Sequence, residues 1–190
     1  MILYILKNAH SSLQHYADNE QDLHPEIDWC VWREPWQRFI SAVWTDVIDN
    51  QTGKASHKTG TAGIIPKMLD KDWLRQQMEG DGVESLYDRA GHMITQWNNL
   101  QKECHRRNLT SGSVRIYSKV HTATKIHYAI EDPHKINVAP PNVIKKIKDT
   151  LIPLKQRIVQ EWLIEDYEIW DQLESVPFID VAVDKIRKDI

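Results

Sequence analysis

A lysine, a histidine and two serines lie close together near the start of the chain, in the segment Lys7-Asn8-Ala9-His10-Ser11-Ser12. The segment follows a short apolar run, residues 2–6, that is typical of a buried strand. Ser11 and Ser12 are residue types that often begin helices. A loop between a buried strand and a helix offers backbone N–H groups and the positive end of the helix dipole. With the ammonium of Lys7 and the two hydroxyls, these groups predict a phosphate or sulfate site.

A second candidate anion site lies between Arg33 and Ser41. Arg33 directly follows residues 27–32, a predicted strand, and an arginine at a strand end can clamp a phosphate through two parallel hydrogen bonds. From Pro35 onward the apolar residues recur at spacings of three and four, which predicts an amphipathic helix. Ser41 lies on this helix and could donate a further hydrogen bond. A surface Arg–Glu pair and an ordinary helix serine would show the same residue types, so this motif gains weight from the first one.

The rest of the chain predicts one compact α/β domain over residues 1–190. Apolar periodicity and alternation predict helices over 72–79, 83–107, 141–149 and 154–173, and strands over 113–119 and 125–130. Residues 50–63 hold three of the seven glycines and predict a flexible loop. Residues 180–190 predict a final short helix or a tail.

Composition excludes several classes of protein. Lys plus Arg is 24 and Asp plus Glu is 27, a net charge of −3, which argues against a nucleic-acid binder held by bulk charge. Two cysteines, Cys30 and Cys104, exclude a disulfide framework and a four-cysteine zinc site. No histidine, cysteine and aspartate cluster has metal-ligand spacing, so we expect no metal. No apolar run approaches the ~20 residues of a membrane helix, and residues 1–6 lack a basic leader, so we expect a cytoplasmic protein without a membrane partner.

Together the two motifs resemble those of the sulfotransferase superfamily, whose donor is 3′-phosphoadenosine 5′-phosphosulfate (PAPS). The first is similar to the family's phosphosulfate loop, Lys-x-x-x-Ser/Thr-Ser/Thr, with Leu6 where a proline is usual. The second, Arg33-Glu34-Pro35-Trp36-Gln37-Arg38-Phe39-Ile40-Ser41-Ala42, looks like the family's 3′-phosphate motif, most of all in the carbohydrate and membrane-type branch. Residues 136–138 and 164–170 show a weaker resemblance to two later elements of that branch, its closing strand and its Asp-Tyr-Glu helix, respectively.

The resemblance implies a P-loop-like, three-layer α/β fold with a short, mostly parallel central sheet flanked by helices. It implies that Lys7 offsets negative charge on the leaving phosphate, as a fixed cation can. It assigns the 3′-phosphate to Arg33 and Ser41. The donor-binding residues that it implies are Lys7, Asn8, Ala9, His10, Ser11, Ser12, Arg33 and Ser41.

An acceptor hydroxyl also needs a general base. In related enzymes a histidine or glutamate between the two motifs has this role, but here the interval is short and the strand usually found there is missing. We take His10 as the catalytic base because it lies in the loop itself. The other candidates are His15, Glu20, His24, Glu26, His57 and His121.

The expected function is transfer of a sulfuryl group from PAPS to a hydroxyl or amine of a carbohydrate or small metabolite, with PAP, the desulfated 3′,5′-bisphosphate, as product. Two alternatives remain open. The short interval favours a non-catalytic module that binds PAPS or another nucleotide. A P-loop nucleotide or small-molecule kinase would need a Gly-Lys-Ser/Thr loop and an acidic magnesium ligand, and the sequence offers neither clearly. Because a second subunit could complete the acceptor cleft, a homo-oligomer also remains open.

Overall fold

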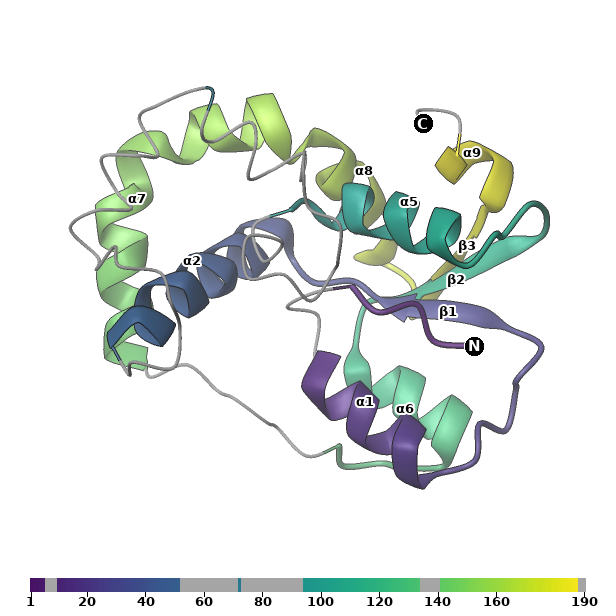
Figure 1. Cartoon of the computed structure of the whole chain (residues 1–190). Helices are drawn as coiled ribbons and strands as arrows, with labels where there is room; N and C mark the ends of the chain where they lie inside the picture. The colour runs from purple at the N-terminus through teal and green to yellow at the C-terminus, as the bar shows by residue number, and fades with distance from the viewer. Residues whose placement is uncertain (6–9, 52–71, 73–93, 134–140, 188–190) are drawn as a thin grey trace. The chain divides into compact units, whose positions relative to one another are not determined.

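The computed structural model describes residues 1–5, 10–51, 72, 94–133 and 141–187 (Figure 1). The chain divides into two compact units, which are described separately. The sheet unit comprises Met1–Pro35, Gln96–Val138 and Glu165–Ile190, and the helical unit comprises Trp36–Thr95 and Ala139–Ile164. The single domain expected over residues 1–190 stays a prediction.

The sheet unit contains a mixed sheet with the strand order β1-β2-β3. The strands are β1 (Asp28–Val31), β2 (Ser113–Tyr117) and β3 (Phe178–Ala182). β1 and β2 are parallel, with Val31 opposite Tyr117, and β3 runs antiparallel to β2. The predicted α/β class is therefore confirmed, and parallel pairing is found between β1 and β2. The more specific P-loop-like fold stays a prediction.

The N-terminal segment continues the parallel pairing on the outer side of β1. Ile2 forms a parallel bridge with Trp29. The Leu3 N–H donates to the Trp29 carbonyl at 2.7 Å, and the Trp29 N–H donates to the Met1 carbonyl at 2.9 Å. The apolar run therefore pairs with β1 in the parallel direction through an isolated bridge at Ile2, and not as a full strand.

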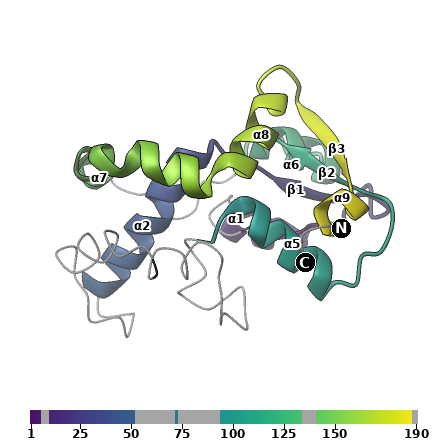
Figure 2. The same ribbon diagram turned by 90° about the horizontal axis from the view of Figure 1, so that it is seen from above.

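Alternating side chains of these strands build a core on each face of the sheet, because successive residues of a strand point to opposite sides. On one face Cys30, Val114, Ile116 and Val181 pack against helices α5 (Gln96–Arg106), α8 (Ile164–Leu173) and α9 (Val183–Arg187). Figures 1 and 2 show α5 and α9 side by side on this face.

On the other face Trp29, Val31 and Tyr117 pack against helices α1 (His10–Asn19) and α6 (Val120–Tyr128). α1 begins where the sequence predicts a helix start. In the sheet unit the sheet therefore lies between two layers of helices, which buries its strands on both faces, as is usual for parallel pairs.

The helical unit contains α2 (Pro35–Gln51), apart from its first residue, and α7 (Pro141–Trp162). The predicted apolar stripe of α2 is confirmed at Trp36, Phe39, Ile40 and Val43, which are all buried. Within α7, Pro153 lies inside the helix.

Four sequence predictions of local structure need correction. Residues 125–130 were expected as a strand, but they belong to α6 and its end, where Ala129 adopts a left-handed conformation. The Ala129 N–H donates to the Lys125 carbonyl, and the Ile130 N–H donates to the Thr124 carbonyl. The final short helix predicted within residues 180–190 is found as α9, but residues 180–182 complete β3 before it. Of the helix expected over 83–107, α5 covers Gln96–Arg106, Ile94 and Thr95 are not helical, and residues 83–93 lie outside the described residues. The helix expected over 154–173 is divided at Leu163 between α7 and α8. Three predicted segments lie outside the described residues: the helix 72–79 apart from Asp72, residues 52–63 of the expected loop, and residues 136–138.

A buried histidine links the α1–β1 connection to the sheet. His127 is fully buried, stacks on the Trp29 ring at 4.2 Å between centroids, and has Nδ1 2.9 Å from Asp22 Oδ1. Its Nε2 lies 3.2 Å from the Tyr117 hydroxyl. A carboxylate only accepts, so Nδ1 carries the proton, and the hydroxyl can donate to Nε2 of a neutral ring. Neutral His127 therefore satisfies both partners.

This cluster predicts loss of stability in mild acid. Burial lowers the pKa of His127, and hydrogen bonds from His127 and the His24 N–H hold the pKa of Asp22 below its ordinary value although burial raises it. Because the pKa of His127 is lower in the folded protein, its contribution to folding stability is fully present above about pH 6.5 and is lost as the pH falls towards the folded pKa. The lowered pKa of Asp22 causes a further loss of stability below about pH 4. We expect the urea midpoint of the wild type to fall between pH 7.5 and pH 5.

The test compares the urea midpoints of His127→Gln and of His105→Gln, which replaces an exposed histidine, at both pH values. His127→Gln should be less stable than the wild type at pH 7.5 and should lose less on acidification. An equal loss in His127→Gln and wild type would contradict a role of His127 in the acid sensitivity.

Candidate functional site

Three parallel segments end at one edge of the sheet, which we call the carboxyl edge. They are residues 2–5, β1 and β2. The Trp32 N–H donates to the Tyr117 carbonyl at 2.8 Å and carries the β1–β2 pairing one residue further. The chain leaves this edge towards α1, towards Arg33 and towards Ser118. In open α/β sheets ligands bind outside the carboxyl ends of strands, so the candidate site is built from this edge.

The first predicted anion site lies only partly within the described residues. Lys7, Asn8 and Ala9 lie outside them. His10, Ser11 and Ser12 form the first turn of α1, and their side chains are not among those described. What the structure adds is the direction of the segment, because residues 2–5 run parallel to β1 and end at the carboxyl edge.

Arg33 lies at the carboxyl edge with its backbone held by a side chain. Its N–H donates to Gln96 Oε1 and its carbonyl accepts from Gln96 Nε2, both at 2.9 Å. The Gln96 amide thus pairs with Arg33 as a neighbouring strand would. Burial lowers the pKa of the half-buried Arg33, against the opposing effect of Glu34, but an arginine remains protonated. A partly dehydrated guanidinium attracts an anion more strongly than an exposed one.

Residues at the start of α8 form hydrogen bonds with the residues before and after Arg33, Trp32 and Glu34. The Tyr167 hydroxyl donates to Glu34 Oε1 at 2.5 Å, and Trp32 Nε1 donates to the Asp166 carbonyl at 3.1 Å. Asp166 and Tyr167 belong to the Asp-Tyr-Glu segment that carries the weaker family likeness. Two segments far apart in the sequence therefore meet beside Arg33.

The Asp166 side chain also fixes Gln96. Its two carboxylate oxygens accept the N–H groups of Gln96 and Trp97, at 2.9 and 2.7 Å, and so cap the start of α5. A carboxylate at this position satisfies two N–H groups that a helix leaves unpaired and interacts favourably with the helix dipole. Asp166 therefore supports Arg33 through Gln96.

Asp166→Ala should destabilise the protein by about 3 kcal/mol, because two buried N–H groups lose a charged acceptor. Urea unfolding at pH 7.5 measures the loss, and Asp171→Ala, at an exposed position of the same helix, should change stability by less than about 0.5 kcal/mol. Equal midpoints for the two variants would contradict a capping role for Asp166.

Ser41, the second residue assigned to the 3′-phosphate, is half-buried in α2 and belongs to the helical unit. Arg33 belongs to the sheet unit. Joint binding of one phosphate by Arg33 and Ser41 therefore stays a prediction.

The candidate bases divide between the two edges of the sheet. Glu20, His24 and Glu26 lie in the connection that enters β1, so they are near its amino end, about 13 Å along the strand from the end that leads to Arg33. His15 is exposed on α1, and His57 lies outside the described residues. His10 begins α1, and its catalytic role stays a prediction. His121 follows β2 at the carboxyl edge.

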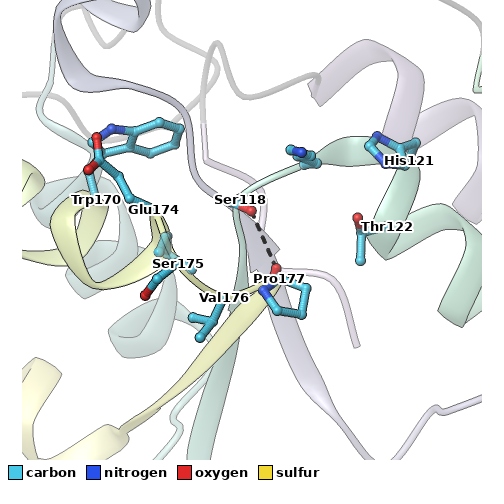
Figure 3. Close-up of a pocket in the computed structure, with 10 residues that line it drawn as sticks. Ser118, His121, Thr122, Trp170, Glu174, Ser175, Val176 and Pro177 are labelled. Atoms are coloured by element: carbon cyan, nitrogen blue, oxygen red, sulfur yellow. Dashed lines mark hydrogen bonds between the residues drawn. The ribbon is translucent and has the colours of Figure 1, made fainter.

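A cavity of about 550 Å³ opens beside His121 (Figure 3). It is lined by Ser118, Lys119, His121, Thr122, Trp170, Leu173, Glu174, Ser175, Val176 and Pro177. Sequence reasoning named only His121 among them. The predicted strand 113–119 included Ser118 and Lys119, whereas β2 ends at Tyr117 and leaves both to line the cavity. No local pattern pointed to Glu174.

The described residues contain no group of three or more histidine, cysteine or acidic side chains that could hold a metal ion. Both cysteines are free and buried, and burial raises the pKa of the Cys104 thiol to about 12, so neither is a ready nucleophile. No helix within the described ranges is long and apolar enough to cross a bilayer.

Relatives offer no independent guide to what this edge does. The chain matches no protein-family model, no curated protein and no solved structure.

Proposed function

We propose that this protein is a sulfotransferase that uses PAPS as its donor substrate and releases PAP. The observation that supports this most is the parallel pairing of Met1, Ile2 and Leu3 with Trp29 of β1. Because of it, the Lys7–Ser12 segment and Arg33 follow neighbouring strands at the same edge. Neighbouring strands are about 4.8 Å apart, so one small bisphosphorylated nucleoside could reach both segments.

The donor contacts follow from the chemistry of each segment. The N–H groups at the start of α1 and the Ser11 and Ser12 hydroxyls suit the 5′-phosphate, because helix N-termini favour anions. Arg33 suits the 3′-phosphate, whose oxygens match the fork of a guanidinium. Gln96 and Tyr167 fix the backbone and neighbour of Arg33 before any ligand arrives. Such preorganisation reduces the ordering cost of binding.

The reaction is a direct transfer. The acceptor oxygen or nitrogen forms a bond to sulfur as the bond between sulfur and the bridging phosphate oxygen breaks. The electron pair of the broken bond stays on the 5′-phosphate of PAP, and a base removes the acceptor's proton. Lys7 offsets the charge that develops on the bridging oxygen. A fixed cation and backbone donors suffice for this role without a metal.

A donor-turnover assay separates this function from a non-catalytic nucleotide module. The wild type is incubated with PAPS labelled in the sulfuryl group, with and without a mixture of methyl glycosides and simple amines. We expect labelled sulfated product and an equal amount of PAP, both dependent on the acceptor. Tight PAP binding without any transfer would contradict the sulfotransferase and support the binding module.

A further inference from the structure

The cavity beside β2 lies entirely within the sheet unit. One side is formed by Ser118 and Lys119, which follow β2, and by the first turn of α6; the other runs from the second half of α8 to the start of β3. The N–H and hydroxyl of Ser118 both donate to the Pro177 carbonyl, at 3.3 and 3.5 Å, and join the two sides at the base. Its volume of about 550 Å³ is in the range of small-molecule sites.

The cavity is placed where an acceptor would have to meet the proposed donor. β2 is the parallel neighbour of β1. The Trp32 N–H donates to the Tyr117 carbonyl, so Trp32, which precedes Arg33, lies beside Tyr117, which precedes Ser118. Donor and acceptor segments therefore leave adjacent strands at one edge. Glu20, His24 and Glu26 precede β1 and lie at the opposite edge.

The cavity walls carry complementary chemistry. Figure 3 shows Trp170 and Glu174 on one side and His121 and Thr122 on the other, with Ser118 between them. The indole of half-buried Trp170 offers an apolar face with a polar tip. The Glu174 carboxylate accepts hydrogen bonds, and the Thr122 hydroxyl donates or accepts. A sugar has an apolar ring face and a rim of hydroxyls, and so matches both kinds of wall.

We propose that this cavity is the acceptor site, that it binds a carbohydrate, and that His121, in place of His10, is the general base for the reacting hydroxyl. The proposal rests on the proposed sulfuryl transfer and names its substrate class and its base. A ring nitrogen of neutral His121 takes the hydroxyl proton as the sugar oxygen bonds to sulfur. The sulfur–oxygen bond to the 5′-phosphate breaks, and its electron pair leaves with PAP. Imidazolium then returns the proton to solvent.

Nuclear magnetic resonance tests the location without knowledge of the natural acceptor. The PAP-saturated protein is titrated with the methyl glycosides of glucose, galactose, N-acetylglucosamine and glucuronic acid, and separately with 4-nitrophenol. Trp170→Phe assigns the Trp170 indole N–H signal. We expect at least one glycoside to shift this signal, with at least tenfold weaker binding in Glu174→Gln and unchanged binding in Glu168→Gln, an exposed position on α8.

Three results would overturn the acceptor site. They are no shift of the Trp170 signal by any glycoside, a shift by 4-nitrophenol alone, and equal glycoside affinity in Glu174→Gln and wild type. PAP binding in the same samples is measured separately. If PAP does not bind, the donor site fails and the acceptor proposal falls with it; if PAP binds and the Trp170 signal does not move, only the acceptor proposal fails.

A paired histidine substitution tests the base. With the glycoside that binds best, His121→Gln should lower single-turnover transfer by about 10²- to 10⁴-fold. PAP and glycoside affinities should stay within about twofold of wild type. His24→Gln, at the opposite edge, should transfer at the wild-type rate. Wild-type transfer by His121→Gln would overturn its role as base.

Discussion

Arg33→Ala is expected to weaken PAP binding by about 10- to 100-fold while changing adenosine 5′-phosphate binding little. A charge-assisted contact with phosphate contributes about 1.5–3 kcal/mol, and each 1.4 kcal/mol is a tenfold change in affinity. Only PAP carries the 3′-phosphate that we assign to Arg33. Calorimetric titration of the variant with each nucleotide measures the two affinities.

Arg106→Ala is the matched control for Arg33→Ala. Arg106 is exposed at the last residue of α5, whereas Gln96 at the first residue touches Arg33, so the control lies about 15 Å away along the helix. It should leave both affinities unchanged. An equal loss of PAP and adenosine 5′-phosphate binding in Arg33→Ala would count against the 3′-phosphate assignment.

Lys7→Ala is expected to lower the rate of sulfuryl transfer by about 10²- to 10³-fold with a much smaller change in PAP affinity. The reason is that negative charge on the bridging oxygen grows as the sulfur–oxygen bond breaks, so a cation placed there stabilises the transition state more than the bound donor. Single-turnover transfer from labelled PAPS gives the rate, and calorimetry gives the affinity.

Lys185→Ala serves as the control for Lys7→Ala. Lys185 is exposed on α9, which follows β3 and therefore lies at the opposite edge, because β3 runs antiparallel to β2. It should transfer at the wild-type rate. An unchanged rate in Lys7→Ala would remove Lys7 from the mechanism.

The parts of the fold that sequence predicted are those that local patterns determine. Three segments show an apolar pattern within their own residues: the run at residues 2–6, the strand before Arg33 and the apolar stripe of α2. The structure contains the corresponding paired segment, β1 and α2. The alternating residues predicted as a strand over 113–119 likewise form β2, which ends at Tyr117.

The misjudged elements depend on contacts that are distant in sequence. Asp166 caps the start of α5 from α8, a contact that is distant in sequence. Thr95, just before α5, is a residue type that often precedes helices, but the long predicted helix 83–107 ran through it. β3 was missed because its alternation, Phe178-Ile179-Asp180-Val181, is short and gains its partner only from β2. Residues 125–130 include β-branched and aromatic residues typical of strands, but burial of His127 against Trp29 favours the helical α6.

The candidate site likewise has residues that the sequence reveals and supporting residues that come from distant segments. The types and spacing of Lys7, Ser11, Ser12 and Arg33 are visible in the sequence, and their chemistry follows from it. The supports of Arg33, namely Gln96 and Tyr167, come from segments more than sixty residues away. The cavity that combines His121 with Trp170 also requires β2 and β3 to be paired first.

Calorimetric titration of the wild type with PAP, beside adenosine 5′-phosphate under the same conditions, tests the donor site most directly. We predict one PAP bound per chain, at least tenfold more tightly than adenosine 5′-phosphate, with a matching rise in the unfolding temperature. Absence of PAP binding, or equal affinity for the two nucleotides, would contradict a site in which neighbouring strands present both phosphate-binding segments to one molecule.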